Sequence, residues 1–113
     1  MSASSDLLAR PIAELGRLIR ARKISCGDLV EACLEREAAT RNLNAYTELF
    51  AEEARSVAEA SQTLLDRSYD LGPLHGIPVA LKGNIAVKGR RTTAGSRILA
   101  DHVPDADAAM VRR

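Results

Sequence analysis

The residues from Leu71 to Lys82 read Leu-Gly-Pro-Leu-His-Gly-Ile-Pro-Val-Ala-Leu-Lys, and they decide the expected fold. The glycines and prolines among the first eight positions mark a tight, closely packed entry of the chain. Val79 to Leu81 is a continuous apolar run, which is typical of a strand buried on both faces. Ile85 to Val87 is a second short apolar run and predicts a neighbouring strand. The region from about residue 71 to 113 is therefore predicted to hold a lysine-bearing strand and the start of a sheet.

Before this region, from about residue 12 to 66, the pattern is helical. Ile12 to Arg22 places its apolar residues on one stripe, which predicts an amphipathic helix. Ser25 is followed three residues later by Asp28, the spacing of a capping box, which predicts the start of a second helix. A third helix is predicted from Ala51 to Asp66, with two glutamates in its first turn.

Four further expectations complete the outline. The short connection Lys23-Ile24 predicts that the first two helices pack as an antiparallel hairpin. Ala45 to Phe50 is expected to be a short strand, and Asp105 is expected to cap a helix over Ala106 to Arg113. Because that helix stops after about two turns and the buried strand has few partners, residues 1–113 are expected to be the truncated N-terminal part of a larger domain.

The composition favours an ordinary globular protein. The chain has 113 residues, 46% of them hydrophobic, and a formal net charge of +1 with 27% charged residues. This balance gives no electrostatic reason to expect direct binding to nucleic acid or to an anionic membrane. We find neither a secretory signal nor an apolar run long enough to span a membrane, so a cytoplasmic location is expected.

The cysteines and histidines give no sign of a metal or cofactor. Cys26 and Cys33 lie seven residues apart in a helical pattern, which separates their Cα atoms by about 10.5 Å, too far for a disulfide. Cys33 is expected to be a small core residue. His75 and His102 are isolated from the cysteines and from each other, so a zinc site is not expected. His75 is predicted to be a hydrogen-bonded structural residue, and His102 a solvated loop residue.

Lys82 is the candidate catalytic residue. An ammonium group at the end of a strand buried on both faces would be desolvated, which lowers the pKa of a lysine and makes the neutral amine accessible. A neutral amine can take a proton from a serine, which then attacks a carbonyl. The alternative is that Lys82 extends to solvent at the end of its strand or pairs with a carboxylate.

The segment from Gly72 to Lys82 is similar, almost position for position, to the Gly-Pro-Leu-His-Gly-Ile-Pro-Val-x-x-Lys segment of the amidase signature family. Thr92-Thr-Ala-Gly-Ser96 and the residues from Val103 to Ala108 also resemble family positions. The helical residues before the motif fit more loosely. The resemblance covers essentially the whole chain, and its central segment is specific.

This resemblance implies an α/β fold, in which a helical N-terminal portion leads into a mixed sheet covered by helices, incomplete in this chain. It implies hydrolysis of a carbon–nitrogen amide bond by a serine nucleophile, a serine in a cis peptide and a lysine, which is Lys82 by position. Both serines are expected in a Gly/Ser-rich stretch after Arg113, and Ser96 corresponds to neither. Gly83 stands where the family typically has aspartate, which puts the efficiency of even the completed protein in question.

Several functions remain open at this stage. The chain could be an amidase fragment that is inactive alone, or one half of a split amidase completed by a second chain. It could also belong to a tRNA-dependent amidotransferase subunit, or be a non-catalytic interaction module. A small-molecule amide is the expected substrate of the complete protein, and a complementing chain or self-association is the expected protein contact. Neither cofactor nor metal is implied.

Overall fold

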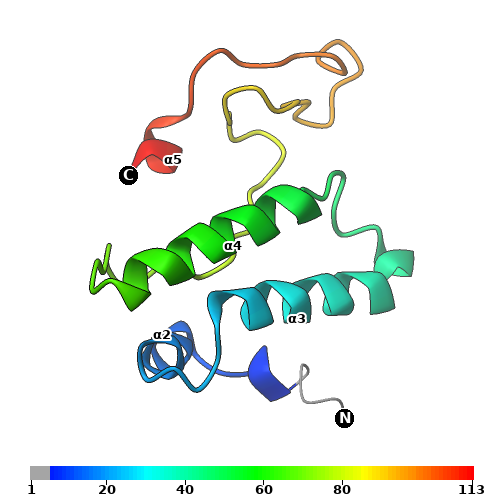
Figure 1. Cartoon of the computed structure of the whole chain (residues 1–113). Helices are drawn as coiled ribbons and strands as arrows, with labels where there is room; N and C mark the ends of the chain where they lie inside the picture. The colour runs from blue at the N-terminus through cyan, green and yellow to red at the C-terminus, as the bar shows by residue number, and fades with distance from the viewer. Residues whose placement is uncertain (1–5) are drawn as a thin grey trace. The chain divides into compact units, whose positions relative to one another are not determined.

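The structure, a computed structural model, describes residues 6–113 of the chain. Two compact units make up the chain, Met1–Pro78 and Val79–Arg113. The described elements are the α-helices and one 3₁₀ turn labelled in Figure 1: α2 (Ile12–Arg20), α3 (Cys26–Ala39), η1 (Arg41–Leu43), α4 (Ala51–Asp66) and α5 (Ala109–Arg112). Among these elements, none has the length and apolar character that a membrane-spanning helix requires.

The helix termini follow from local chemistry. The Ser25 Oγ accepts a hydrogen bond from the Asp28 N–H at 3.0 Å, and the Asp28 carboxylate accepts one from the Ser25 N–H at 2.8 Å. This reciprocal pair is the predicted capping box, and it begins α3 by satisfying two backbone donors that the helix leaves unpaired. The bounds predicted for α4 are also confirmed, from Ala51 to Asp66.

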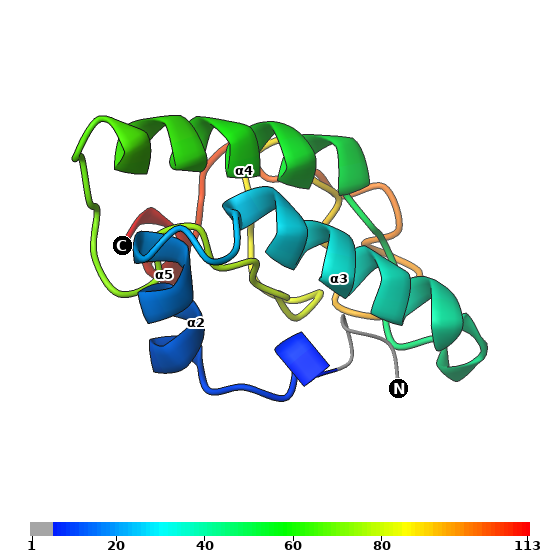
Figure 2. The ribbon, with the colours of Figure 1, turned by 60° about the horizontal axis from the view of Figure 1, so that its bottom comes forward.

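The predicted hairpin between the first two helices is wrong. Figures 1 and 2 show α3 and α4 running antiparallel side by side, whereas α2 lies across them, and α3 and α4 share the most extensive helix-to-helix contact. The reason lies at the end of α2, where Arg22 has a left-handed φ of 56° and the Lys23 N–H donates to the Leu18 carbonyl at 2.9 Å. This C-terminal turn redirects the chain before α3 begins.

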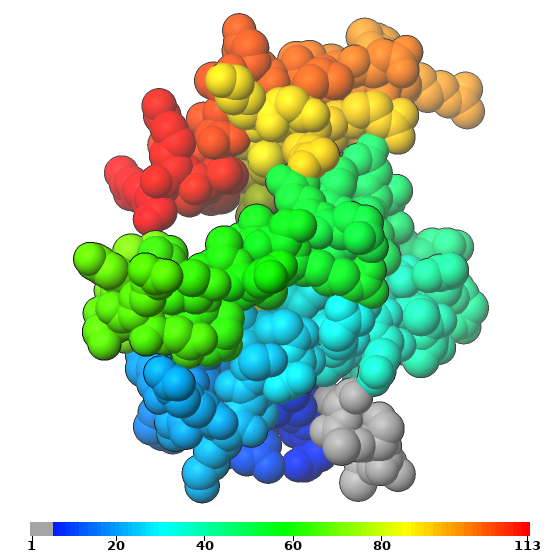
Figure 3. Space-filling view, viewed as in Figure 1, coloured from blue at the N-terminus to red at the C-terminus, as the bar shows by residue number. Residues whose placement is uncertain are grey.

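The core of the first unit lies where the three helices meet. Leu15 and Ile19 of α2 pack with Cys26, Leu29 and Val30 of α3 and with Ala58 of α4. In the space-filling view, the side chains of α3 and α4 pack directly against each other (Figure 3). Burying a leucine or isoleucine side chain contributes about 1.5–3 kcal/mol, so this cluster is the main stabilising feature of the unit.

The thiol in this core is Cys26, which is fully buried, whereas Cys33 is only partly buried. Cys33, which was expected to be a small core residue, lies at the margin of the core, and Cys26 is the cysteine of the buried cluster. Cys26 is covered because the chain returns over the N-terminus of α3 after α4 has ended, and Gly76 comes to lie against the thiol. Figure 2 shows this returning segment passing α2 and approaching α3.

The second unit, Val79–Arg113, is held by isolated backbone hydrogen bonds between two antiparallel stretches. The Gly89 N–H donates to the Pro104 carbonyl at 3.0 Å and the Thr92 N–H donates to the His102 carbonyl at 2.9 Å. The Ala108 N–H donates to the Ala86 carbonyl at 2.9 Å. Residues 86–92 and 102–108 therefore lie alongside each other without forming a regular ladder.

Strands were expected at Ala45–Phe50, Val79–Leu81 and Ile85–Val87, and none forms in residues 6–113. A strand needs a neighbour that pairs its backbone at every second residue. Turns at Lys82–Ile85 and around Gly89 interrupt such pairing in the second unit. Val79 and Leu81 are 66% and 48% exposed, so the cover that a doubly buried strand requires is also missing within the described chain.

The last helix is shorter than predicted. It covers Ala109–Arg112 with Ala108 at its N-cap, and Asp105 does not cap it. The Asp107 carboxylate instead accepts a hydrogen bond from the Lys88 N–H at 2.7 Å. This contact, together with the Ala108–Ala86 bond, holds residues 107 and 108 extended, so the helix begins later.

Candidate functional site

Lys82 lies in the second unit on a stretch of backbone that is fixed on its C-terminal side. Its carbonyl accepts a hydrogen bond from the Ile85 N–H at 2.9 Å, which closes a turn. The carbonyl of Gly83 accepts one from the Ala94 N–H at 3.0 Å. These two bonds join the lysine turn to the loop from Thr92 to Ser96, so the segments that resemble the amidase signature meet at Gly83.

The Lys82 side chain is exposed, which differs from the expected burial. Within residues 6–113 it makes no hydrogen bond or ion pair, so no described carboxylate neutralises it. The expected desolvation depended on a strand covered on both faces, and that cover is missing in this part of the chain. What the structure provides is a fixed backbone that presents the amine outward.

The loop opposite Lys82 is built by hydrogen bonds of its own. Thr92 is buried, and its hydroxyl donates to the Arg90 carbonyl at 3.3 Å. Ala94 and Gly95 both adopt left-handed φ values, 49° and 70°, so the chain turns tightly here. The Ser96 Oγ accepts a hydrogen bond from the Ile98 N–H at 3.2 Å. Ser96 is therefore a turn-forming residue, which agrees with the expectation that it corresponds to neither family serine.

We call Leu71–Lys82 the signature segment, since it holds the residues that resemble the amidase signature. Its first part, up to Pro78, is anchored in the helical unit by Arg20. The guanidinium of Arg20 donates to both carboxylate oxygens of Asp70, at 2.7 and 2.8 Å, and to the Gly72 carbonyl at 2.8 Å. It also donates to the Gly16 carbonyl at 3.0 Å. This pairing, together with the hydrogen bond from the Gly72 N–H, lowers the pKa of Asp70 to about 2. The sequence carries no local signal for a contact between residues fifty positions apart.

His75 anchors the same segment to α4. The residue as a whole is 7% exposed, its ring Nδ1 accepts a hydrogen bond from the Leu71 N–H at 2.9 Å, and its Nε2 lies 2.9 Å from the Ser61 carbonyl oxygen. The prediction of a hydrogen-bonded structural histidine is confirmed. His102 is exposed, which agrees with the loop position predicted for it.

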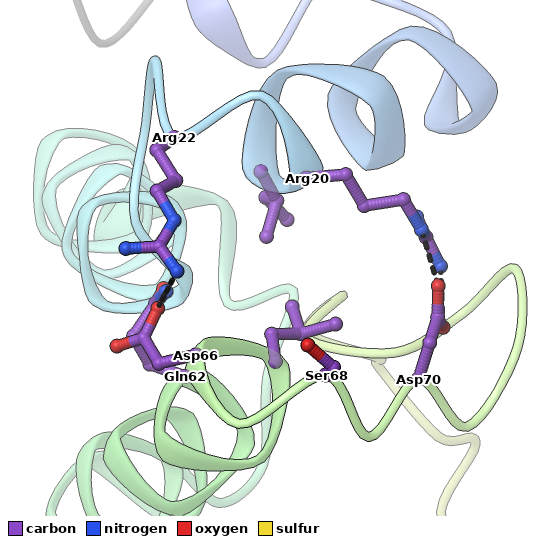
Figure 4. Close-up of a pocket in the computed structure, with 8 residues that line it drawn as sticks. Arg20, Arg22, Gln62, Asp66, Ser68 and Asp70 are labelled. Atoms are coloured by element: carbon purple, nitrogen blue, oxygen red, sulfur yellow. Dashed lines mark hydrogen bonds and ion pairs between the residues drawn. The ribbon is translucent and has the colours of Figure 1, made fainter.

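A polar cavity of about 170 Å³ lies between the end of α2 and the end of α4 (Figure 4). Arg20 and Arg22 project into its rim and face Asp70 and Asp66, with Gln62 beside Asp66. Each of these polar side chains has a partner within the unit. Lys82 does not line this cavity, which we interpret as part of the scaffold.

The other reactive side chains are not activated. Burial raises the pKa of the thiols of Cys26 and Cys33, so neither is an activated nucleophile. In residues 6–113, no group of three or more His, Cys, Asp or Glu side chains is arranged to hold a metal ion. Lys82 is therefore still the predicted catalytic residue.

Comparison with known proteins shows the family to which the chain is related. The family model described as Amidase matches residues 28–113, which include Lys82. A glutamyl-tRNA(Gln) amidotransferase subunit of Moorella thermoacetica is 43% identical over 101 residues, which cover 88% of this chain and 21% of the relative. The corresponding subunit of Granulibacter bethesdensis is 42% identical over 114 residues, covering 100% of this chain and 22% of the relative.

A more distant relative is the corresponding mitochondrial subunit of Canis lupus familiaris, 33% identical over 107 residues, which cover 95% of this chain and 20% of the relative. The chain thus spans about a fifth of the length of the curated relatives that it matches. No solved structure matches it.

Proposed function

The chain belongs to the amidase family, and on that premise we propose that Lys82 is the general base of an enzyme that hydrolyses carbon–nitrogen amide bonds. In this mechanism the neutral amine of Lys82 takes a proton, through a serine held in a cis peptide, from a serine nucleophile. The nucleophile attacks the amide carbonyl, and the leaving amine takes up the proton that Lys82 had accepted. Water then gives a proton to the same base, attacks the acyl group and releases it as the carboxylic acid, which restores the serine. The two serines would come from residues outside these 113, since no Gly/Ser-rich stretch stands among them.

The observation that carries this proposal is the contrast between the backbone and the side chain at Lys82. The carbonyls of Lys82 and Gly83 are both hydrogen-bonded, to Ile85 and Ala94, whereas the Lys82 side chain is exposed. A catalytic lysine needs a fixed position, because proton transfer requires the base within hydrogen-bond reach of its partner.

The proposal also explains how a hydrated lysine could act as a base. Cover from further protein would remove water from the amine and favour its neutral form. Val79 and Leu81, exposed on either side of Ala80, would be buried by the same cover. We further propose that Val79–Leu81 becomes a strand of a mixed sheet under that cover.

The experiment is a complementation assay with the Granulibacter bethesdensis relative, which matches this chain over its full length. The matching segment of the relative is replaced by residues 1–113, either joined in one chain or co-expressed as a separate chain. Both forms are assayed for amide hydrolysis beside residues 1–113 alone and the relative without its segment. Activity of a hybrid, with neither part active alone, is the expected result. Two folded but inactive hybrids would favour a non-catalytic interaction module.

A second candidate is a subunit of an amidotransferase, because the relatives at 43% and 42% identity are both named as glutamyl-tRNA(Gln) amidotransferase subunits. The substrates would then be an amide donor and a tRNA-bound acceptor. Other parts of the assembly would bind most of both. The same hybrid distinguishes the two functions when it is given glutamine and glutamyl-tRNA(Gln). Amidated tRNA as the product supports the amidotransferase, and hydrolysis of simple amides without it supports the amidase.

A further inference from the structure

The imidazole of His75 is bonded at both of its nitrogens, and both partners belong to the backbone. Nδ1 faces the Leu71 N–H at 2.9 Å, and Nε2 faces the Ser61 carbonyl oxygen of α4 at 2.9 Å. The residue as a whole is 7% exposed, so water does not readily replace either partner. The histidine therefore links the start of the signature segment to a helix that precedes it in the chain.

These two partners accept only one form of the ring. A backbone N–H is a donor, so Nδ1 must carry a lone pair, and a carbonyl is an acceptor, so Nε2 must carry the proton. Both bonds are satisfied by the neutral imidazole protonated at Nε2. In the imidazolium form both nitrogens are donors, and Nδ1–H would then point at the Leu71 N–H.

We propose that His75 is a proton-sensitive clasp, which holds the Leu71–Pro78 segment to α4 while the ring is neutral and releases the segment at Leu71 when Nδ1 takes up a proton. The proton comes from solvent, and the bond that is lost runs from the Leu71 N–H to Nδ1. The bond from Nε2 to Ser61 keeps its donor in both states. Release is therefore local to Leu71 and its neighbours.

Several titratable and charged groups lie close to His75, on its own segment and on helices of the same unit. On the same segment, the Asp70 carboxylate is near His75 and is already paired with Arg20 of α2. From α3, the Cys26 thiol lies against Gly76, the next residue, and Asp66 of α4 acts on that thiol. Because Asp70 and Arg20 are already paired with each other, the hydrogen-bond role of Nδ1 is what distinguishes the two forms of the ring here.

The clasp sits at the head of the segment that continues into Lys82, seven residues further along. The two remaining anchors of this segment do not depend on His75: Arg20 binds Asp70 and Gly72, and Gly76 packs on Cys26. Protonation should therefore loosen one end of the segment without unfolding the helical unit. This inference stands on the first unit alone and does not rest on the proposed function.

The test is nuclear magnetic resonance on the whole chain, titrated from pH 8.5 to pH 5. Ring nitrogen shifts give the tautomer and protonation of His75 and His102 separately. Hydrogen exchange of the Leu71 amide, corrected for the pH dependence of the intrinsic rate, reports the clasp. We expect the Nε2–H tautomer at high pH, and a loss of Leu71 protection of about fivefold or more, the scale of one hydrogen bond, that follows the protonation of His75.

The two histidines supply matched controls. His75→Gln keeps an acceptor and a donor without a titrating ring, so protection of Leu71 should no longer change with pH, and His102→Gln should leave the wild-type behaviour intact. A Nδ1–H tautomer of His75 would overturn the proposal. So would Leu71 protection that is unchanged as His75 protonates, or a ring that stays neutral until the whole unit unfolds. Because the wild-type readouts decide these outcomes, a variant that fails to fold does not leave the proposal open.

Discussion

Gly76 approaches Cys26 so closely that a Cβ atom added to the glycine would lie 2.5 Å from the Cys26 Sγ. The glycine also has a left-handed φ of 77°, which side chains other than hydrogen rarely adopt. Both observations explain the residue type at position 76. They also show that the signature segment contributes to the packing of the helical unit as well as leading to Lys82.

Gly76→Ala should therefore be strongly destabilising, by about 2 kcal/mol or more, because backbone strain and overpacking act together. Urea unfolding followed by the helical circular dichroism signal measures the change. Gly83→Ala is the matched control, since a Cβ at Gly83 would meet nothing within 4 Å. Indistinguishable unfolding curves for the two variants would show that the close approach to Cys26 is wrong.

The capping box makes a second prediction about stability. Ser25→Ala removes the acceptor for the Asp28 N–H and should cost about 1 kcal/mol, measured by the same unfolding curves. Ser56→Ala, on the exposed surface of α4 away from either end, is the control and should be neutral or slightly stabilising because alanine favours helix. If the serine at position 25 can be replaced without cost, the cap does not determine where α3 begins.

The ion pair between Arg20 and Asp70 predicts how stability depends on pH. The pKa of Asp70 is lowered to about 2, so its contribution is fully present above the ordinary carboxylate range and is lost as the pH falls from about 4 towards 2. Arg20→Ala should flatten the acid dependence in that window. Arg17→Ala removes an exposed arginine from the same helix and should retain the wild-type slope. Equal slopes for the two variants would contradict the pairing.

The features that sequence reasoning predicted are those with a local cause. The capping box at Ser25 and the bounds of α4 follow from residues within a few positions of each other. The features it missed depend on distant contacts: Arg20 with Asp70, and Gly76 with Cys26. The second of these decided which cysteine is buried, and helical periodicity alone cannot give that information.

At the candidate site, sequence reasoning identified Lys82 but expected the wrong environment for it. The apolar run Val79–Leu81 predicts a covered strand only if the covering partners are present, and pattern says nothing about where those partners lie. The bond between Gly83 and Ala94, which fixes the backbone beside Lys82, likewise joins segments that the sequence places eleven residues apart.

Gly83 stands where the amidase family typically has aspartate, and a substitution at this position tests what that difference does. An aspartate here would place an anion beside Lys82, which opposes the neutral amine before proton transfer but stabilises the ammonium formed in it and can orient that group towards its partner. Since a Cβ at Gly83 meets nothing within 4 Å, Gly83→Asp should fold normally. In the hybrid it should raise the rate of amide hydrolysis above that of the parent. Gly83→Asn, of the same size without the charge, is the control, and equal rates for the two would remove the electrostatic argument.

The central claim, that Lys82 is the general base, is tested most directly by the steady-state rate of amide hydrolysis in the joined hybrid. Lys82→Ala should lower kcat by roughly a thousandfold or more, as removal of the base from a serine–base unit does. Lys82→Arg should not restore it, because a guanidinium stays protonated. Lys88→Ala removes another exposed lysine of the same unit and should keep the parent rate. Near-parental rates in either Lys82 variant would contradict the claim and assign Lys82 to the scaffold.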